Sequence, residues 1–294
     1  MQKCLLLISL LFSISLPFYV FSCELPKEEK IRIGCSYDCH FIYRFRLNLL
    51  ALKKGYSLEF VDLRNERNFN KSLNEIDGIL LPGGADIHPL YYLDSVSSEL
   101  REYTKNHLHL VKFSREGRER DPFEYLLVKK YSEDESLKNV PMLGICRGMQ
   151  MMAVAQGIPL YLDIKTELGI RNRYNRFDQI EVFSMPDSTS HSLMQTLYPK
   201  DSFKGFKLHH QGIRVPYYNQ HSSDFPFTRV SAYSNDGKIA ESLEYLHRPA
   251  LGVQFHPERS FSEASDPILG WFLKKSCEKK YSSLLLRPIN SVKE

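Results

Sequence analysis

Cys146 stands between two glycines in the stretch GICRG, residues 144–148. An apolar run precedes the cysteine and a Met-rich amphipathic run follows it, which predicts a strand that passes directly into a helix. The sharp turn at such a junction holds a side chain in a strained, exposed position, as in the nucleophile elbow G-x-S-x-G. The N-terminus of the following helix favours a reactive thiolate. We therefore predict that Cys146 is a nucleophile.

A cysteine nucleophile needs a general base, and the base needs a group that orients it. The stretch VQFHPERS places His256 directly after an apolar run, so this histidine is also expected at a strand end. Glu258 follows two residues later and can hold the ring nitrogen that does not face the sulfur, while Pro257 stiffens the link. The pattern predicts a Cys146–His256–Glu258 triad.

The stretch LPGGAD supplies the third component of such a site. Attack on an amide carbon creates an oxyanion, which needs preorganised N–H donors. The backbone N–H of Arg147, next to the nucleophile, can be one donor. Glycine lets the backbone approach closely, so the second donor is predicted at Gly84 or Gly83, with Gly84 preferred.

The surrounding pattern indicates an α/β fold. Apolar strands are expected at 31–37, 57–63, 140–146 and 250–255, and a strand that runs into a glycine turn at 76–86. Helices are expected at 43–56, 121–135, 147–157 and 262–280. Alternation of this kind predicts a mostly parallel central sheet with helices on both faces. The C-terminal half adds a small antiparallel portion at 179–185, 228–234 and 238–246, the last two joined by the turn signal NDG.

Length and composition fit one globular domain. The chain has 294 residues, 43% hydrophobic residues and a net charge of +4, which gives no ground for a nucleic-acid or membrane-surface partner. We expect a hydrolase domain at residues 26–280 and a C-terminal tail at 281–294.

Residues 1–22 are predicted to be a signal peptide, with one positive charge at Lys3, an apolar stretch and a cleavage site before Cys23. Export to the periplasm or the exterior is therefore expected. An uncleaved membrane anchor is the alternative, and lipid attachment at Cys23 is a third form.

Export bears on the remaining cysteines, because thiols outside the cytosol tend to pair. Cys35 and Cys39 are close enough for a local disulfide, although two free thiols, or a metal site that includes His40, stay open. If Cys23, Cys35, Cys39 or Cys277 reached Cys146, oxidation would inactivate the nucleophile.

The blocks GILLPGGAD, GICRGMQ and GVQFHPE resemble, in order and spacing, the three signature blocks of class I glutamine amidotransferases. The sequences ICRG, KLHHQGIRV and RERD (118–121) look most like the γ-glutamyl-γ-aminobutyrate hydrolase branch, a group of cysteine hydrolases. The resemblance implies a flavodoxin-like fold, the triad and oxyanion hole named above, and no metal or organic cofactor.

The resemblance also implies a small γ-glutamyl amide or peptide as the substrate. Gln150, His209 and Gln211 are candidate substrate contacts, although His209 can equally be a loop histidine with no direct role, and His210 can narrow the substrate pocket. The expected reaction is hydrolysis through a γ-glutamyl thioester. The alternatives are a glutaminase subunit that delivers ammonia to a partner and a noncatalytic binding protein. A homodimer is possible, and a membrane partner is expected only if the N-terminal segment is retained.

Overall fold

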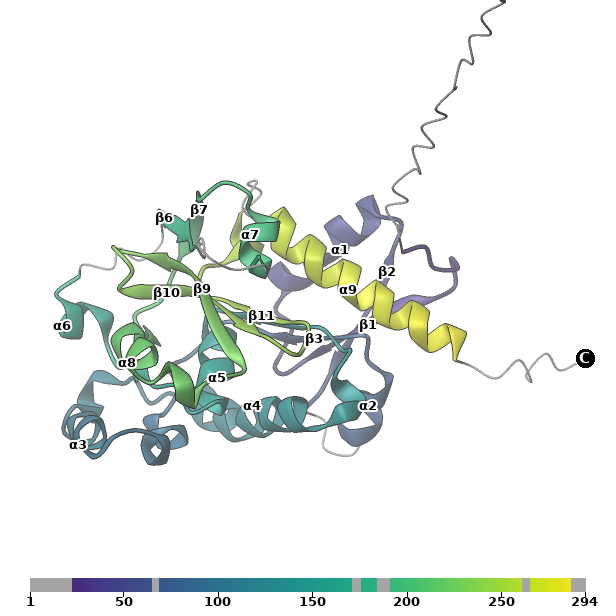
Figure 1. Ribbon diagram of the computed structural model, residues 1–294. Coiled ribbons are helices and arrows are strands. Elements are labelled where there is room, and N and C mark those ends of the chain that lie inside the picture. The colour runs from purple at the N-terminus through teal and green to yellow at the C-terminus, as the bar shows by residue number, and fades with distance from the viewer. Residues whose placement is uncertain (1–22, 65–68, 171–175, 184–190, 261–264, 287–294) are drawn as a thin grey trace, which may run out of the picture.

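The computed structural model describes residues 23–64, 69–170, 176–183, 191–260 and 265–286. The predicted signal peptide lies outside these residues. Within them, the central feature is a nine-stranded sheet with the strand order β2-β1-β3-β4-β11-β10-β9-β6-β7. Figure 1 shows this sheet in the middle of the molecule with helices on either side.

One half of the sheet is parallel. Its strands are β1 (Lys30–Cys35), β2 (Ser57–Asp62), β3 (Gly78–Leu81), β4 (Met142–Ile145) and β11 (Ala250–Val253). Neighbouring members pair in parallel register, for example Gly144 with Gly252. The carboxyl ends of all five strands therefore lie at one edge of the sheet, as the sequence pattern predicts.

The other half is antiparallel. It contains β10 (Ile239–Tyr245), β9 (Thr228–Ser234), β6 (Arg176–Val182) and β7 (Ser202–Lys207). The turn between β9 and β10 has positive φ at Asn235, Asp236 and Gly237, which confirms the hairpin predicted from NDG. A separate pair joins β5 (Leu160–Tyr161) to β8 (Gly212–Ile213).

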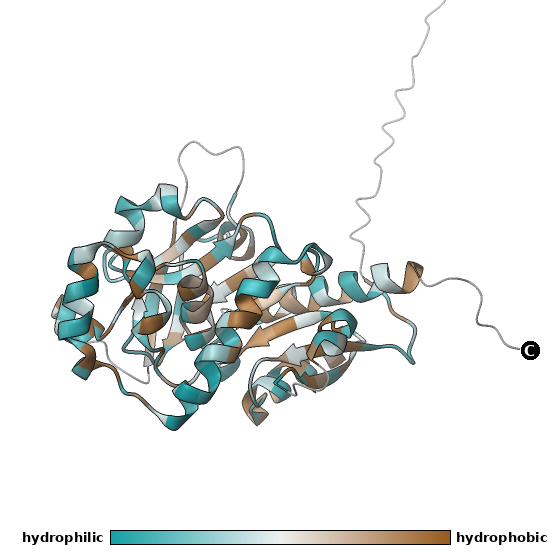
Figure 2. Cartoon of the chain, turned by 90° about the horizontal axis from the view of Figure 1, so that it is seen from below, coloured by the Kyte–Doolittle hydropathy of each residue, from teal (hydrophilic) through white to brown (hydrophobic). Residues whose placement is uncertain are grey.

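Two hydrophobic layers cover the sheet. α1 (Phe41–Lys53) and α9 (Asp266–Leu285) pack on one face, and α4 (Arg115–Glu133) and α5 (Arg147–Ala155) on the other. Successive strand residues point to opposite faces, so Ile79 joins the α4–α5 layer and Leu80 the α1–α9 layer. Figure 2 shows hydrophobic residues gathered in the central strands and mostly hydrophilic helix surfaces.

The shorter helices are α2 (Phe69–Glu75), α3 (Ser98–Asn106), α6 (Ile164–Leu168), α7 (Leu193–Leu197) and α8 (Val215–Gln220). The sequence pattern predicted none of these helices, nor β5, β7 and β8. Most of these elements are too short to show a clear period, while α3 is largely polar and β7 carries lysines and a glycine among its residues. Of the expected strand at 179–185, residues 184 and 185 lie outside the described residues.

The predicted helix boundaries were most wrong for α4 and α9. α4 begins at Arg115 rather than at residue 121, because the side chain of Ser114 accepts a hydrogen bond from Gly117 N–H at 2.9 Å and caps the helix there. Pro122 consequently lies inside the helix. α9 continues to Leu285, past the predicted domain limit at residue 280.

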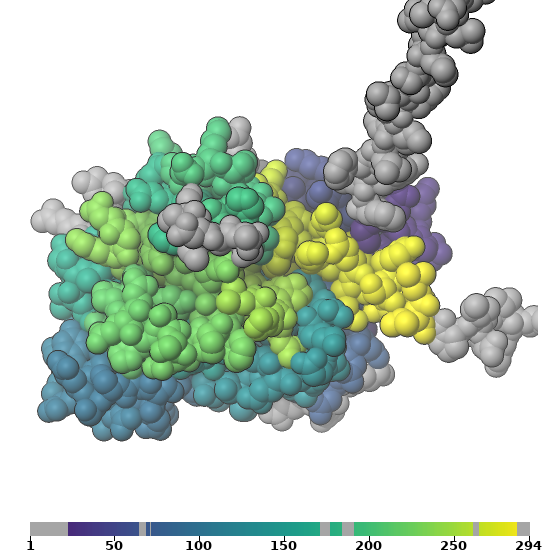
Figure 3. Space-filling model, in the orientation of Figure 1, coloured from purple at the N-terminus to yellow at the C-terminus, as the bar shows by residue number. Residues whose placement is uncertain are grey.

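Two disulfides are present among the described residues. Cys35 pairs with Cys39, which decides between the alternatives left open by the sequence, and Cys23 pairs with Cys277. The second bridge joins the N-terminal segment to α9, and Figure 3 shows α9 crossing the surface beside the purple N-terminal residues. Among the described helices, none has the length and hydrophobicity to cross a bilayer.

Candidate active site

Cys146 occupies the turn between β4 and α5 with φ of 53°. A non-glycine residue rarely adopts positive φ, so this conformation is strained, as expected for a nucleophile elbow, although the side chain is buried and not exposed as predicted. The flanking glycines make the turn possible. A Cβ on Gly144 would lie 2.7 Å from the carbonyl carbon of Gly148, and a Cβ on Gly148 would collide with the backbone of Leu81.

His256 and Glu258 meet beside this elbow. The ring Nδ1 lies 2.7 Å from Glu258 Oε1, and both side chains are buried. His256 Nε2 makes no hydrogen bond to an oxygen or nitrogen of the described residues. Burial lowers the pKa of His256, but the charges of Cys146 and Glu258 raise it more, and the pKa reaches about 10. The structure thus brings together the three residues predicted as a triad.

Two further groups contact the sulfur. Cys146 Sγ lies 3.7 Å from the carbonyl oxygen of Leu208, to which the thiol can donate. Gln254 Nε2 donates to Sγ at 3.5 Å, and its Oε1 accepts from Gln150 Nε2 at 3.1 Å. Gln254 therefore links the nucleophile to α5.

The glycine loop after β3 lies against Cys146. A Cβ on Gly83 would come within 3.6 Å of Cys146 Cβ and 3.1 Å of His256 Cε1. The N–H of Gly83 already donates to the hydroxyl of Tyr43 at 2.9 Å, so it is not free to bind an oxyanion. Between the two glycines predicted for the oxyanion hole, this geometry favours Gly84.

Arg120 fixes the orientation of the peptide group between Gly83 and Gly84. Its guanidinium donates to Gly83 O at 2.9 Å and to Pro82 O at 2.8 Å. In a trans peptide the C=O and the following N–H point in opposite directions. The N–H of Gly84 is consequently directed away from Arg120. A Cβ at Gly84 would collide with Arg120 and Glu116, so glycine is required there.

A buried charge network supports both the loop and the elbow. The Arg147 side chain pairs with Asp121 and Glu124, and Arg120 pairs with Glu124 at 3.0 Å. Ser36 on the β1–α1 loop donates to Glu124 at 2.7 Å. Burial lowers the pKa of Arg147 to about 9 and raises that of Asp121, although their mutual attraction opposes both shifts. The network joins β1, β3, α4 and α5 behind the nucleophile.

A cavity of about 400 Å³ opens onto Cys146. Cys146, His256, Gly83 and Gly84 line it, so the predicted nucleophile, the predicted base and the glycine loop face one space. Its other walls are formed by the β1–α1 loop, the start of α1, α4 and the segment before β8. The space is large enough for a small amide substrate.

The three residues predicted to contact the substrate lie outside the lining of this cavity. Gln150 is buried, and its Nε2 also donates to the carbonyl of Gln211 at 2.9 Å. His209 is buried with Nδ1 2.8 Å from the same carbonyl, and burial lowers its pKa to about 3, so the ring is neutral. Gln211 Oε1 accepts from Ile87 N–H at 3.0 Å. The lining of the cavity includes none of the three, and their substrate roles stay predictions.

His210 bridges two loops instead of narrowing the cavity. Its Nε2 lies 2.7 Å from Asp86 and its Nδ1 3.2 Å from Asp163. Burial lowers the pKa of His210, but the two carboxylates raise it more, so the net shift is upward. The residue ties the loop after β3 to the segment after β5.

The two disulfides leave none of the other four described cysteines free to pair with Cys146 and inactivate it. Cys23, Cys35, Cys39 and Cys277 are consumed in disulfides, and Cys146 is the free cysteine among the described residues. Among the described residues, no second thiol is therefore available to form a disulfide with Cys146.

The sequence pattern did not single out Tyr43, Arg120, Glu124 or Gln254. Gln254 carried a usable signal, since it is a polar residue inside the apolar run that ends at His256. The charged run RERD was interpreted only by resemblance, because its burial depends on contacts with Arg147 and the glycine loop that are distant in sequence.

The family model for peptidase C26 matches residues 49–258, which include the glycine loop, the cysteine elbow and the His–Glu pair. Among curated proteins, NtpR of Enterococcus hirae is 29% identical over 202 residues, which cover 66% of this chain and 71% of that protein. The γ-glutamyl-γ-aminobutyrate hydrolase PuuD of Escherichia coli is 28% identical over 205 residues, covering 65% of this chain and 67% of the relative.

The fold is also found among solved structures. The glutaminase domain of Trypanosoma brucei CTPS, solved with bound acivicin, superposes with a TM-score of 0.56 at 16% identity. The match covers 85% of this chain and 94% of that domain. The α/β architecture with its mixed sheet is thus that of glutamine amidotransferases, as the sequence predicted.

Proposed function

We propose, because this chain belongs to the peptidase C26 family, that it hydrolyses γ-glutamyl amide bonds through a thioester on Cys146. The observation that carries the proposal is the shared cavity, onto which the strained Cys146, His256 and the glycine loop open together. The name of the Escherichia coli relative, a γ-glutamyl-γ-aminobutyrate hydrolase, supports the γ-glutamyl acyl group.

In the first step Cys146 Sγ attacks the carbonyl carbon of the γ-amide. The carbonyl oxygen becomes an oxyanion, whose stabilisation we assign to the N–H groups of Gly84 and Arg147. His256, whose raised pKa keeps the imidazolium available at neutral pH, donates its proton to the leaving amine. The C–N bond breaks and the γ-glutamyl thioester remains on the sulfur.

In the second step a water molecule replaces the amine. Neutral His256 removes a proton from this water, which attacks the thioester carbon and releases glutamate and the thiol. Glu258 holds Nδ1 at 2.7 Å, so the same ring nitrogen can serve as acid and then as base. The sum of the two steps is amide plus water to glutamate plus amine.

We also propose that the protein acts after export, because residues 1–22 have the pattern of a signal peptide. An anchored protein on the membrane surface is the alternative. The Cys35–Cys39 and Cys23–Cys277 disulfides support an oxidising location.

The test is intact-protein mass after incubation with a diazo-ketone or chloro-ketone analogue of glutamine. Wild type should gain one adduct, and Cys146→Ala should gain none because its nucleophile is missing. His256→Gln should react at least about 100-fold more slowly, because the thiol loses its base.

Arg248→Gln is the matched control, since this largely buried cation contacts Asp134 and Glu135 outside the cavity. It should react as wild type does. Release of glutamate from a γ-glutamyl amide should follow the same order of variants. An unmodified wild-type protein that releases no glutamate would refute the hydrolase and favour a binding protein on this fold.

A further inference from the structure

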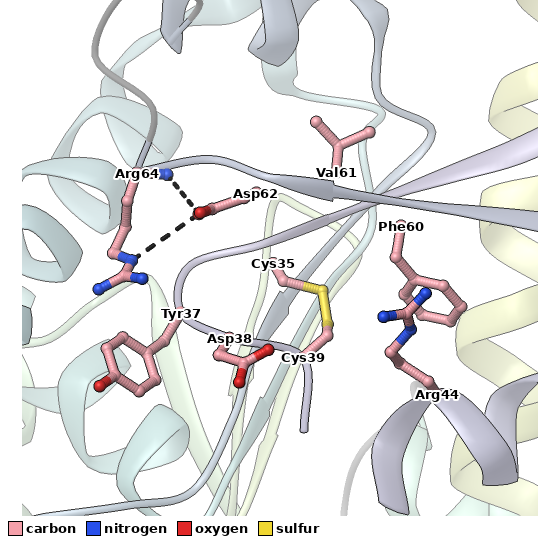
Figure 4. A pocket seen from close by; sticks show the side chains of 9 residues that line it. All are labelled: Cys35, Tyr37, Asp38, Cys39, Arg44, Phe60, Val61, Asp62 and Arg64. Atoms are coloured by element: carbon pink, nitrogen blue, oxygen red, sulfur yellow. Dashed lines mark hydrogen bonds and ion pairs between the residues drawn. A yellow bond between two sulfur atoms is a disulfide. The ribbon is translucent and has the colours of Figure 1, made fainter. Parts of the chain in front are cut away.

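A second cavity adjoins the active-site cavity at the carboxyl ends of β1 and β2 (Figure 4). Its volume is about 410 Å³, and Cys35 and Asp62, the last residues of the two strands, line it. Because β2, β1, β3 and β4 are neighbours in this order in one sheet, the second cavity lies at the same edge of the sheet as Cys146. Ligands of open α/β sheets bind at this edge.

Tyr37 and Asp38 form the wall between the two cavities, because both residues line both spaces. Two guanidinium groups lie near the Tyr37 ring, one from each cavity. Arg120, of the active-site cavity, lies 4.5 Å from the ring centroid, and Arg64, of the second cavity, lies 4.3 Å from it. A ligand that extends from one cavity into the other would pass along Tyr37 and Asp38.

The second cavity presents one unpaired charge of each sign. Arg64 Nε lies 3.7 Å from Asp62 Oδ1, so these two charges offset each other. Asp38 and Arg44 form no ion pair with any of the described residues, and the Arg44 guanidinium lies 5.4 Å from the centroid of Phe60. In the view of Figure 4, Arg44 lies on one side of the disulfide and Arg64 on the other, with Asp38 between them.

The loop that carries Asp38 is covalently closed. The Cys35–Cys39 disulfide joins the end of β1 to the residue after Asp38. A loop held in this way loses less conformational freedom when a ligand binds, which favours binding. Asp38 is therefore presented on a preorganised turn at the border of the two cavities.

Bond lengths decide which half of a substrate reaches the second cavity. The glutamyl Cα is three bonds from the attacked carbonyl carbon, a span of about 4 Å. Its ammonium and carboxylate therefore stay in the cavity that contains Cys146. The leaving amine extends from the carbonyl carbon in the other direction and has no such limit.

We propose that the second cavity is the leaving-group subsite, and that it takes an amine ending in an α-amino acid group, as the side-chain amine of lysine does. This inference rests on the proposed γ-glutamyl hydrolase function. Arg44 pairs with the carboxylate of the leaving group and Asp38 with its ammonium. The five bonds between Nε and Cα of lysine span about 6 Å, so this side chain separates the zwitterionic end from the attacked amide.

The test compares kcat/KM for Nε-(γ-glutamyl)lysine with kcat/KM for γ-glutamyl-n-butylamine, whose leaving amine lacks both charges. Wild type should favour the lysine substrate. Asp38→Asn and Arg44→Gln should each lower this ratio about fivefold, the upper range for an exposed ion pair. Lys274→Gln, which removes a half-exposed cation from α9 outside both cavities, is the matched control and should keep the wild-type ratio.

Two more substrates give a signature that a merely structural effect would not produce. Asp38→Asn should shift preference toward γ-glutamyl-γ-aminobutyrate, whose free end is anionic. Arg44→Gln should shift it toward γ-glutamylputrescine, whose free end is cationic. Opposite shifts in the two variants support the subsite.

Three outcomes would overturn the proposed leaving-group subsite. Hydrolysis with the same substrate ratios in wild type and both variants would show that the cavity does not recognise the leaving group. Equal losses on every substrate, glutamine included, would assign these charges to the glutamyl head group. Absence of hydrolysis of any γ-glutamyl amide by wild type would instead refute the proposed function, and the subsite with it.

Discussion

The two ends of the catalytic sheet edge are built in different ways. Beside β3 and β4, charged side chains such as Arg147, Arg120 and Glu124 are buried and bonded to one another and to the glycine loop. Beside β1 and β2, Asp38 and Arg44 are exposed, and a disulfide holds the loop. The difference separates two tasks: the buried ion pairs fix the groups around Cys146, whereas the exposed charges of Asp38, on the disulfide-closed loop, and of Arg44, on α1, are proposed to recognise the leaving group.

The largest expected effect is a loss of folding stability when the buried charges beside β3 and β4 are disturbed. Arg147→Met removes the ion-pair partner of Asp121 and one of the two arginines paired with Glu124, and an uncompensated buried charge costs about 3–5 kcal/mol. Chemical denaturation monitored by fluorescence should show this loss. Arg115→Met removes an exposed arginine that pairs with Glu119, and it should cost less than about 1 kcal/mol. Equal losses in the two variants would contradict the comparison.

A second variant tests what the buried end does for the reaction. Arg120→Lys keeps the charge but cannot hold the carbonyls of Pro82 and Gly83 together, so the Gly84 N–H should lose its orientation. We expect kcat to fall about 100-fold with little change in KM, because the oxyanion is stabilised only in the transition state. A rise in KM at constant kcat would assign Arg120 to substrate binding instead.

The third prediction concerns the braced loop. Cys35→Ser with Cys39→Ser removes a bridge over a short loop, which should cost about 2 kcal/mol or less of stability. Since Asp38 would lose its preorganised position, the preference for the lysine substrate over the butylamine substrate should also fall. Thermal unfolding and the ratio of kcat/KM values measure the two effects. A variant with the wild-type ratio would show that the disulfide does not support recognition.

The smallest effect is a pH dependence from His209. Burial lowers its pKa in the folded protein to about 3 from the ordinary 6.5, so between these values only the unfolded chain binds the proton. The stability that this group contributes is complete well above pH 6.5 and is lost as the pH decreases toward 3, by about 1–2 kcal/mol between pH 6.5 and 5. His209→Gln should remove this slope in denaturation curves measured across the range. An unchanged slope would assign the acid sensitivity to other groups.

The sequence predicted the parts of the molecule that rest on local pattern. The strands and helices around Cys146 and His256 follow hydrophobic periodicity, and the elbow follows from two glycines at fixed spacing. Tyr43, Arg120 and Glu124 could not be predicted in this way. Tyr43 meets Gly83 across 40 residues and Ser36 meets Glu124 across 88, so their roles exist only after the sheet has formed.

The bridge between Cys23 and Cys277 changes the topology of the chain. It joins residues 254 positions apart and closes nearly the whole folded part into a covalent ring. A single backbone cut by a protease anywhere inside this ring leaves one connected molecule rather than two fragments. For an enzyme proposed to act outside the cell, where proteases are met without chaperones, a first nick would then leave the halves of the site tethered and able to reassociate.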